Sequence, residues 1–214
     1  MFEDLFIEKR SITDCICGHC GHVNPIVSSF DVSNFVKSKE YLDGSREDMR
    51  EYFDKKEIMC ENCHNVGNSL EYDAIKNVNA DIVQDIIKSV QSNIEQKLLI
   101  AYHEFPNYYT ALDLYYYYDM HKNLNERNRY ANLCIEFSKN MINYQLYDNV
   151  IVVIADIYRR MGMFEKVRSL YKHINKLYLI NLKKHGSNTQ LKNLSMLQKE
   201  LMLCKNGDIE KHFA

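Results

Sequence analysis

The sequence predicts a mostly α-helical protein that begins with a small, cysteine-rich α+β module. Three observations support this prediction: cysteines paired as Cys-x-x-Cys near the N-terminus, a shortage of helix-breaking residues, and apolar residues at helical spacing over most of the chain. The 214 residues include only 2 prolines and 7 glycines, which favours long helices because both residues destabilise a helix interior. We expect two domains, residues 1–76 and residues 77–214.

The composition is that of an ordinary soluble protein. Hydrophobic residues make up 46% of the chain and charged residues 26%, so the chain can bury a core. No stretch reaches the roughly 20 apolar residues of a membrane span, and the start of the chain is acidic where a signal peptide is basic. We therefore expect a cytoplasmic protein, in which thiols stay reduced and clustered cysteines are metal ligands rather than disulfides.

Two Cys-x-x-Cys turns carry the most specific signal in the first domain. They are Cys17-Gly18-His19-Cys20 and Cys60-Glu61-Asn62-Cys63, and each is followed three residues later by a valine. This spacing lets both thiolates of one turn reach the same tetrahedral ion, and two turns complete a shell of four sulfur ligands. The expected ligands of one structural zinc ion are therefore Cys17, Cys20, Cys60 and Cys63.

Other interpretations of these cysteines stay open. Cys15 can replace Cys17, although the Cys-x-Cys spacing that it makes is poorer, and one of the nearby histidines can also replace a thiolate. These histidines are His19, His22 and His64. Two chance thiol pairs, or a redox dithiol, are further alternatives, but a dithiol explains only one pair at a time.

The paired turns resemble a zinc ribbon, in which two such turns sit at the ends of short β-hairpins. Gly18 and Gly21 are expected to ease the tight backbone path of the first turn, and Asn62 and Asn65 that of the second. The spacer between the turns is longer than the roughly 15–20 residues of the compact form, so we expect an insertion that is helical around residues 46–53. A closed four-thiolate shell implies a role in folding, because it leaves no position for water.

The second domain is expected to consist of helices joined by short links, which implies antiparallel neighbours. Apolar stripes place these helices at residues 80–102, 108–121, 126–144, from 148 to a C-cap at 162, from 163 onward, and at 189–204. Asn79 and Asp148 are expected N-caps, and Gly162 is the expected C-cap. Cys134 and Cys204 lie on apolar stripes and should be core thiols. The tyrosines at 115–118 point in four directions, so we expect that not all are buried.

One segment of this domain resembles a tetratricopeptide repeat. The repeat's leucine, small residue, first aromatic, turn glycine and two further aromatics are matched here by Ile154, Ala155, Tyr158, Gly162, Phe164 and Tyr171. Val167 and Ile174 depart from the usual alanines, so the packing should be looser than in the ideal repeat. One repeat cannot bury its own face. Neighbouring antiparallel hairpins of the tetratricopeptide-repeat type are therefore expected to complete the stack.

Together, the paired cysteine turns and the segment ADIYRRMGMFEKVRSLY resemble a bacterial family of unknown function. In that family a zinc-ribbon-like region precedes a tetratricopeptide-repeat-like helical region. The resemblance rests on these two motifs alone. It implies an architecture and a zinc ion, but no activity.

The expected function is that of a zinc-binding adaptor that binds a protein or peptide in a groove between helices. The residues expected to line this groove are Tyr116, Tyr117, Arg159 and Arg160. The alternative is a nucleic-acid-binding or regulatory protein that uses the zinc ribbon and the basic stretch 159–184, although residues 1–75 are acidic overall. No phosphate-binding loop, nucleophile elbow or His-Glu-x-x-His helix is present, so we expect no enzymatic activity.

Overall fold

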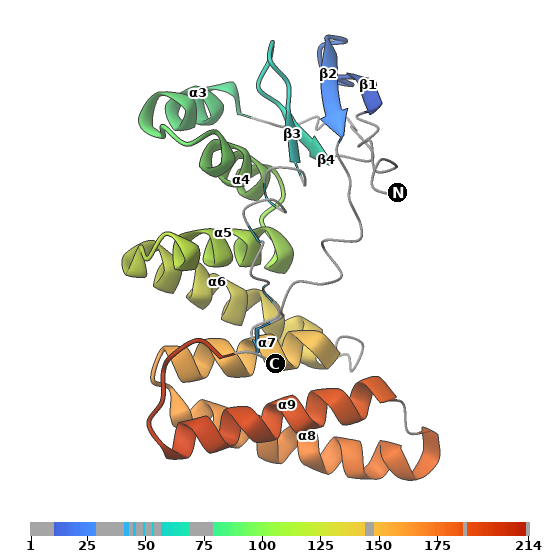
Figure 1. The fold of residues 1–214 in the computed structure, drawn as a ribbon, viewed down its shortest axis with the longest axis vertical. Coiled ribbons are helices and arrows are strands. Elements are labelled where there is room, and N and C mark those ends of the chain that lie inside the picture. Colours follow the sequence, from blue (N-terminus) through green and yellow to red (C-terminus); the bar gives the residue numbers. More distant parts are fainter. Residues whose placement is uncertain are drawn as a thin grey trace, which may run out of the picture. The chain divides into compact units, whose positions relative to one another are not determined.

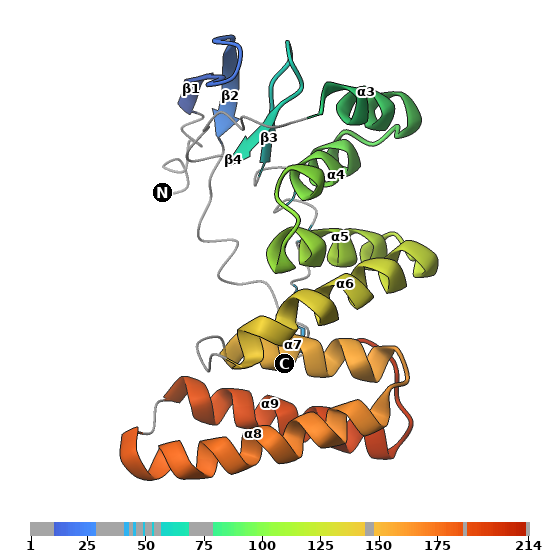
Figure 2. The same cartoon turned by 180° about the vertical axis from the view of Figure 1, so that it is seen from behind.

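The computed structural model is mostly helical in the part of the chain that it describes (Figure 1, Figure 2). The described residues are 11–28, 41, 42, 45, 49, 53, 57–68, 79–143, 148–185 and 188–212. The chain folds as two compact units, which are residues 1–37 with 48–117, and residues 38–47 with 118–214. The boundary expected after residue 76 therefore falls within the first unit.

Two short antiparallel β-hairpins belong to the first unit (Figure 1). Strand β1 (Ser11–Ile16) pairs with β2 (Val23–Ser28), and β3 (Glu57–Met59) pairs with β4 (Val66–Asn68). Each Cys-x-x-Cys turn lies in the loop that joins the two strands of one hairpin. The structure thus agrees with a small α+β module, while the zinc-ribbon type of that module stays a prediction.

Helices α3 (Ala80–Ser89) and α4 (Asn93–Glu104) belong to this unit. Helix α5 (Tyr108–Met120) begins in the first unit and ends in the second. The expectation of one helix over residues 80–102 is wrong, because Val90 is extended and Ser92 caps a new helix by accepting the Glu95 N–H at 3.3 Å. Gln96 Nε2 donates to the carbonyl of Val90 at 2.6 Å, which satisfies a carbonyl left free where α3 ends. Asn79 caps α3 as expected.

The apolar core of the first unit joins the second hairpin to α3 and α4. Its buried members are Val66, Val83, Ile86, Ile100 and Ala101. Helix α4 packs against both β3 and β4. The hairpin that carries the second cysteine turn therefore packs against helices.

All four consecutive tyrosines of α5 are buried, so the expectation that some face solvent is wrong. Tyr117 donates a hydrogen bond to Ser92 Oγ at 3.0 Å and contacts Phe53 edge-on at 6.3 Å between ring centroids. Tyr118 stacks on Tyr130 at 5.6 Å. Burial of a tyrosine is tolerated where its hydroxyl finds a partner.

The second unit contains α6 (Leu124–Asn143), α7 (Asp148–Arg160), α8 (Phe164–His185) and α9 (Asn188–Lys205). Helix α7 packs against α6, α8 and α9, and nearly all of its described side chains are buried. The buried apolar cluster of this unit is Ile151, Val152, Ala155, Val167, Ile174, Leu197 and Cys204. Among the described helices, none has both the length and the apolar character needed to cross a membrane.

Three helices end in the same hydrogen-bonded motif. After α7, Gly162 has a φ of 73°, and the Met163 N–H donates to the Tyr158 carbonyl at 2.8 Å, which is the Schellman arrangement. Gly162 is thus the C-cap that the sequence predicts. Lys122 after α5 and Gly207 after α9 also have positive φ. Three-residue links therefore join α5 to α6 and α7 to α8, and the tetratricopeptide type of these hairpins stays a prediction.

Arg159 lies at the centre of a buried ion-pair cluster in the second unit. Its Nε donates to Glu200 Oε2 and its Nη2 to Asp156 Oδ1, both at 2.6 Å, and Nη1 donates to the Asp208 carbonyl at 3.0 Å. Arg159 and Glu200 are fully buried, and Asp156 is 1% exposed. The carboxylates hold the pKa of Arg159 above its ordinary value against the opposing effect of burial. The cluster fastens α9 and the segment after it to α7.

The spacer between the cysteine turns passes through the second unit, to which residues 38–47 belong. The Leu42 N–H donates to the His212 carbonyl at 2.9 Å, and Lys211 Nζ lies 4.3 Å from the centre of the Tyr41 ring. Leu42 and Ser45 are buried. In the range 46–53, expected to be helical, the structure describes Met49 and Phe53, both in helical conformation, and the other positions lie outside the described residues.

We predict that Glu200→Ala destabilises the protein by about 3–5 kcal/mol, because it leaves a buried arginine without one of its carboxylate partners. The matched control is Glu165→Ala, which removes the partner of Arg168 at an exposed site and should cost about 0–1 kcal/mol. Urea unfolding followed by circular dichroism measures both changes. Equal losses in the two variants would contradict the importance assigned to the buried cluster.

Candidate metal centre

The two cysteine turns share one backbone geometry. The Cys17 N–H donates to the His22 carbonyl at 2.8 Å, and the Cys60 N–H donates to the Asn65 carbonyl at the same distance. In each turn the carbonyl of the first cysteine accepts a second hydrogen bond. The Gly21 N–H donates to the Cys17 carbonyl at 2.7 Å, and the His64 N–H donates to the Cys60 carbonyl at 2.9 Å. The hydrogen bonds hold both cysteines of each turn at the end of its hairpin.

The residue after the second cysteine adopts a left-handed backbone conformation in both turns. Gly21 has a φ of 72° and His64 a φ of 60°. Glycine adopts this conformation freely, whereas a residue with a Cβ pays about 1 kcal/mol for it. Asn62 and Asn65 were expected to ease the tight backbone path of the second turn, but the residue with left-handed backbone in that turn is His64.

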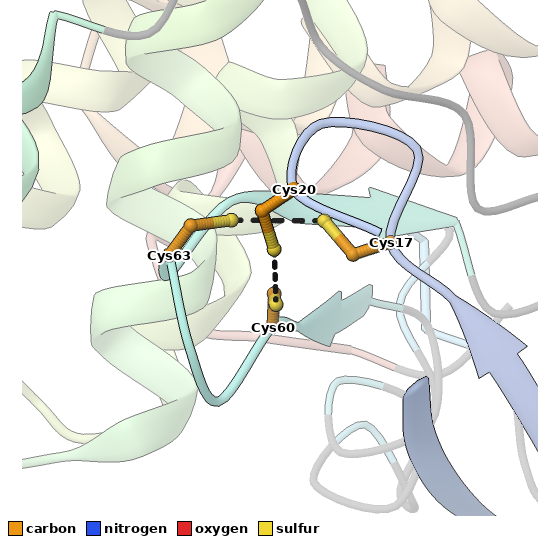
Figure 3. A group of neighbouring side chains, drawn as sticks. All are labelled: Cys17, Cys20, Cys60 and Cys63. Carbon is orange, nitrogen blue, oxygen red and sulfur yellow. Dashed lines mark hydrogen bonds between the residues drawn. The ribbon is translucent and has the colours of Figure 1, made fainter. Parts of the chain in front are cut away.

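The four thiols converge on one point (Figure 3). Cys17 Sγ lies 3.6 Å from Cys63 Sγ, and Cys20 Sγ lies 3.6 Å from Cys60 Sγ. All four sulfur atoms lie within 4.8 Å of one another. In a tetrahedral site with Zn–S bonds of about 2.3 Å, neighbouring sulfurs are about 3.8 Å apart. The cluster thus has the dimensions of a four-sulfur metal site.

These separations exclude a disulfide between the described thiols. A disulfide requires sulfur atoms about 2.0 Å apart, and the four cysteines of the cluster are free thiols. The histidines near the turns are not part of the cluster in the described structure. Cys15 lies in β1 opposite Asn24, and its side chain lies outside the described residues. Among the described residues, the four thiols that could hold a metal ion are those that the sequence predicts as ligands.

Exposure differs among the four cysteines. Cys17 and Cys60 are buried, Cys63 is partly buried and Cys20 is exposed. A metal ion at the cluster would therefore have its most solvent-exposed ligand in Cys20.

Hydrogen bonds and burial shift the pKa values of the thiols in different directions. Burial disfavours the Cys60 thiolate, but the backbone N–H groups of Cys63 and Asn62 donate to its sulfur and lower its pKa to about 6. A hydrogen bond from Asn62 lowers the pKa of Cys20, and burial raises the pKa of Cys63. Because cysteine binds a metal ion as the thiolate, the affinity of this cluster for a metal ion would fall as pH falls.

Asn24 joins the two turns and was not identified from the sequence. Its side chain is 3% exposed. Its Oδ1 accepts the backbone N–H of Glu61 at 3.0 Å, and its Nδ2 donates to the carbonyl of His22 at 3.2 Å. One amide thus fixes the relative position of the two cysteine pairs. The sequence carries no signal for this role, because the partner in the second turn lies 37 residues away.

The four residues expected to line a partner-binding groove are buried, which corrects that expectation. Their exposed fractions are 7% for Tyr116, 4% for Tyr117, 0% for Arg159 and 8% for Arg160. Arg160 binds the carboxylate of Asp119, which also accepts a hydrogen bond from Lys211 Nζ at 3.2 Å. Acidic residues of the chain itself neutralise the two arginines, and all four residues are withdrawn from solvent.

Comparison of the chain with models of known protein families, with curated proteins and with solved structures gave no match.

We predict that Asn24→Ala lowers metal affinity by about 10- to 100-fold, the loss typical of a residue that positions metal ligands. Competition with a chromophoric chelator measures this affinity. His19→Ala is the matched control, because His19 is exposed in the same turn and lies outside the thiol cluster. An Asn24→Ala protein with the affinity of the His19→Ala protein would show that Asn24 does not position the turns.

Proposed function

We propose that this chain is a zinc-binding protein whose metal ion has a structural role. The observation that carries the proposal is the group of four thiol sulfurs within 4.8 Å of one another. Soft thiolate ligands in a tetrahedral array favour zinc among the common metal ions. Four sulfur ligands leave no coordination position for water or substrate, so the ion would contribute to folding and not to hydrolysis. The proposal therefore includes no enzymatic activity.

In this proposal the helices form a cytoplasmic adaptor that binds a protein or peptide. Since the tyrosines and arginines first expected at the contact are buried, exposed aromatic side chains are better contacts. Phe105 and Tyr109 are 54% and 51% exposed and flank the turn between α4 and α5. Asn107 stiffens this turn, because its Oδ1 accepts the N–H of Tyr109 at 2.8 Å. Rigid exposed aromatics are typical of interface hot spots.

We predict that the purified protein carries one zinc ion, which native mass spectrometry detects as a mass increase over the apo chain. Cys60→Ser should abolish metal binding, because it removes a buried ligand from a closed shell. Cys134→Ser is the matched control: Cys134 is also buried but lies in α6, outside the cluster, and this variant should retain the ion. A metal-free protein that is nevertheless fully folded would refute the structural zinc proposal.

We predict that Phe105→Ser combined with Tyr109→Ser weakens capture of protein partners from cell extract by at least about tenfold, as loss of hot-spot aromatics does. Zinc content and helical circular dichroism should not change, because both side chains are exposed. Met202→Ser is the control, since Met202 is 66% exposed on α9. Capture that is equal in both variants would remove the α4–α5 turn from the adaptor surface.

A further inference from the structure

The hairpin formed by α8 and α9 carries an excess of positive charge that the rest of the chain does not share. Residues 164–205 contain nine lysines and arginines and two glutamates, a net charge of +7, whereas the whole chain has a net charge of −2. The other residues therefore carry a net charge of −9. Charge segregated in this way creates a local positive field on a protein that is acidic overall.

The two glutamates of this hairpin are already paired with arginines. Glu165 binds Arg168 one helical turn later, and Glu200 is fully buried against Arg159 of α7. Among the described residues, no ion pair is found for Lys166, Lys172 or Lys176 of α8. The charge of these three lysines is therefore left to solvent or to a partner.

The lysines in the described first half of α8 lie on its solvent face. Val167 and Ile174 point into the core, while the exposed residues of the described part of α8 include Lys166, Lys172 and Lys176. At 100° per residue, Lys172 and Lys176 are about 40° apart around the helix, and Lys166 and Lys176 are about 15 Å apart along its axis. Helix α9 adds three more exposed lysines, which are Lys192, Lys199 and Lys205.

We propose that the α8–α9 hairpin binds the phosphate backbone of a nucleic acid without reading its sequence. This inference goes beyond the proposed zinc and adaptor function and does not depend on it. Lysine is a compact point charge suited to phosphate, whereas base recognition in the major groove depends on bidentate side chains such as arginine. Contacts of lysine with phosphate alone fix orientation and affinity but carry no sequence information.

An acidic peptide fits this surface less well. Between the lysines of α8 the exposed residues are Ser169 and His173, both polar, so this stretch has no fully exposed apolar side chain on which a peptide could pack. On α9 the exposed apolar residues Leu191 and Met202 are eleven positions, or about 16 Å, apart along the helix, which is too far for one pocket. A polyanion needs only the charge that the surface supplies.

The test is fluorescence anisotropy with labelled single-stranded RNA, single-stranded DNA and duplex DNA oligonucleotides, each of two unrelated sequences, over a range of salt concentrations. We expect binding that weakens steeply with salt and differs little between the two sequences of each type. Lys172→Glu with Lys176→Glu should weaken duplex binding by at least about tenfold and reduce the slope of log affinity against log salt by about 2, since each phosphate contact contributes about 0.9.

The matched control is Lys88→Glu with Lys139→Glu, which changes the net charge equally at exposed positions on α3 and α6. This control should bind nucleic acid as the unaltered protein does, and circular dichroism should show that both double variants are folded. The proposal is overturned if no oligonucleotide binds, if both double variants lose affinity equally, or if labelled polyglutamate binds the unaltered protein as tightly as the oligonucleotides.

Discussion

The convergence of four thiols on one point brings together two turns that are far apart in the sequence, and the arrangement of the first unit depends on it. Cys20 Sγ and Cys60 Sγ are 3.6 Å apart although 40 residues separate them in sequence. The middle of that spacer packs in the second unit, where the Leu42 N–H bonds to the His212 carbonyl. The spacer is thus fixed at both ends by the cluster and in its middle by the second unit. A metal ion bound at the cluster would close this loop and so lower the entropic cost of ordering the segment between the two turns.

The two hairpins depend on this cluster to different degrees. The last strand pair before the second turn is Met59 with Val66, and both pack on the core with α3 and α4. The corresponding pair before the first turn, Ile16 with Val23, is 63% and 48% exposed. An isolated two-stranded hairpin is marginal in water. At this exposed pair the first hairpin has little cover, and the described contacts that join its turn to the second turn are the cysteine cluster and Asn24.

Short-range features and the four-cysteine cluster were predictable from the sequence, whereas the other long-range contacts were not. The N-cap at Asn79 and the C-cap at Gly162 depend on residues within a few positions, and the two distant cysteine turns could be paired because each is recognisable by its own Cys-x-x-Cys spacing. The break at residues 90–92 was missed because an apolar stripe runs across it without a proline or glycine. Asn24 and the buried state of Arg159 were also missed, since each is decided by partners tens of residues away, namely Glu61 for one and Glu200 for the other.

The basic stretch at 159–184 shows why a run of like charges is a weak guide to binding. Its first two arginines lie at the end of α7, where Asp156, Glu200 and Asp119 neutralise them. Beyond the turn at Gly162, the chain enters α8, where the described lysines Lys166, Lys172 and Lys176 are exposed while Val167 and Ile174 are buried. Charge is available to a partner only where the fold leaves it at the surface and supplies no counter-charge. Helical periodicity can indicate the first condition, but the second depends on which acidic residues the fold brings near.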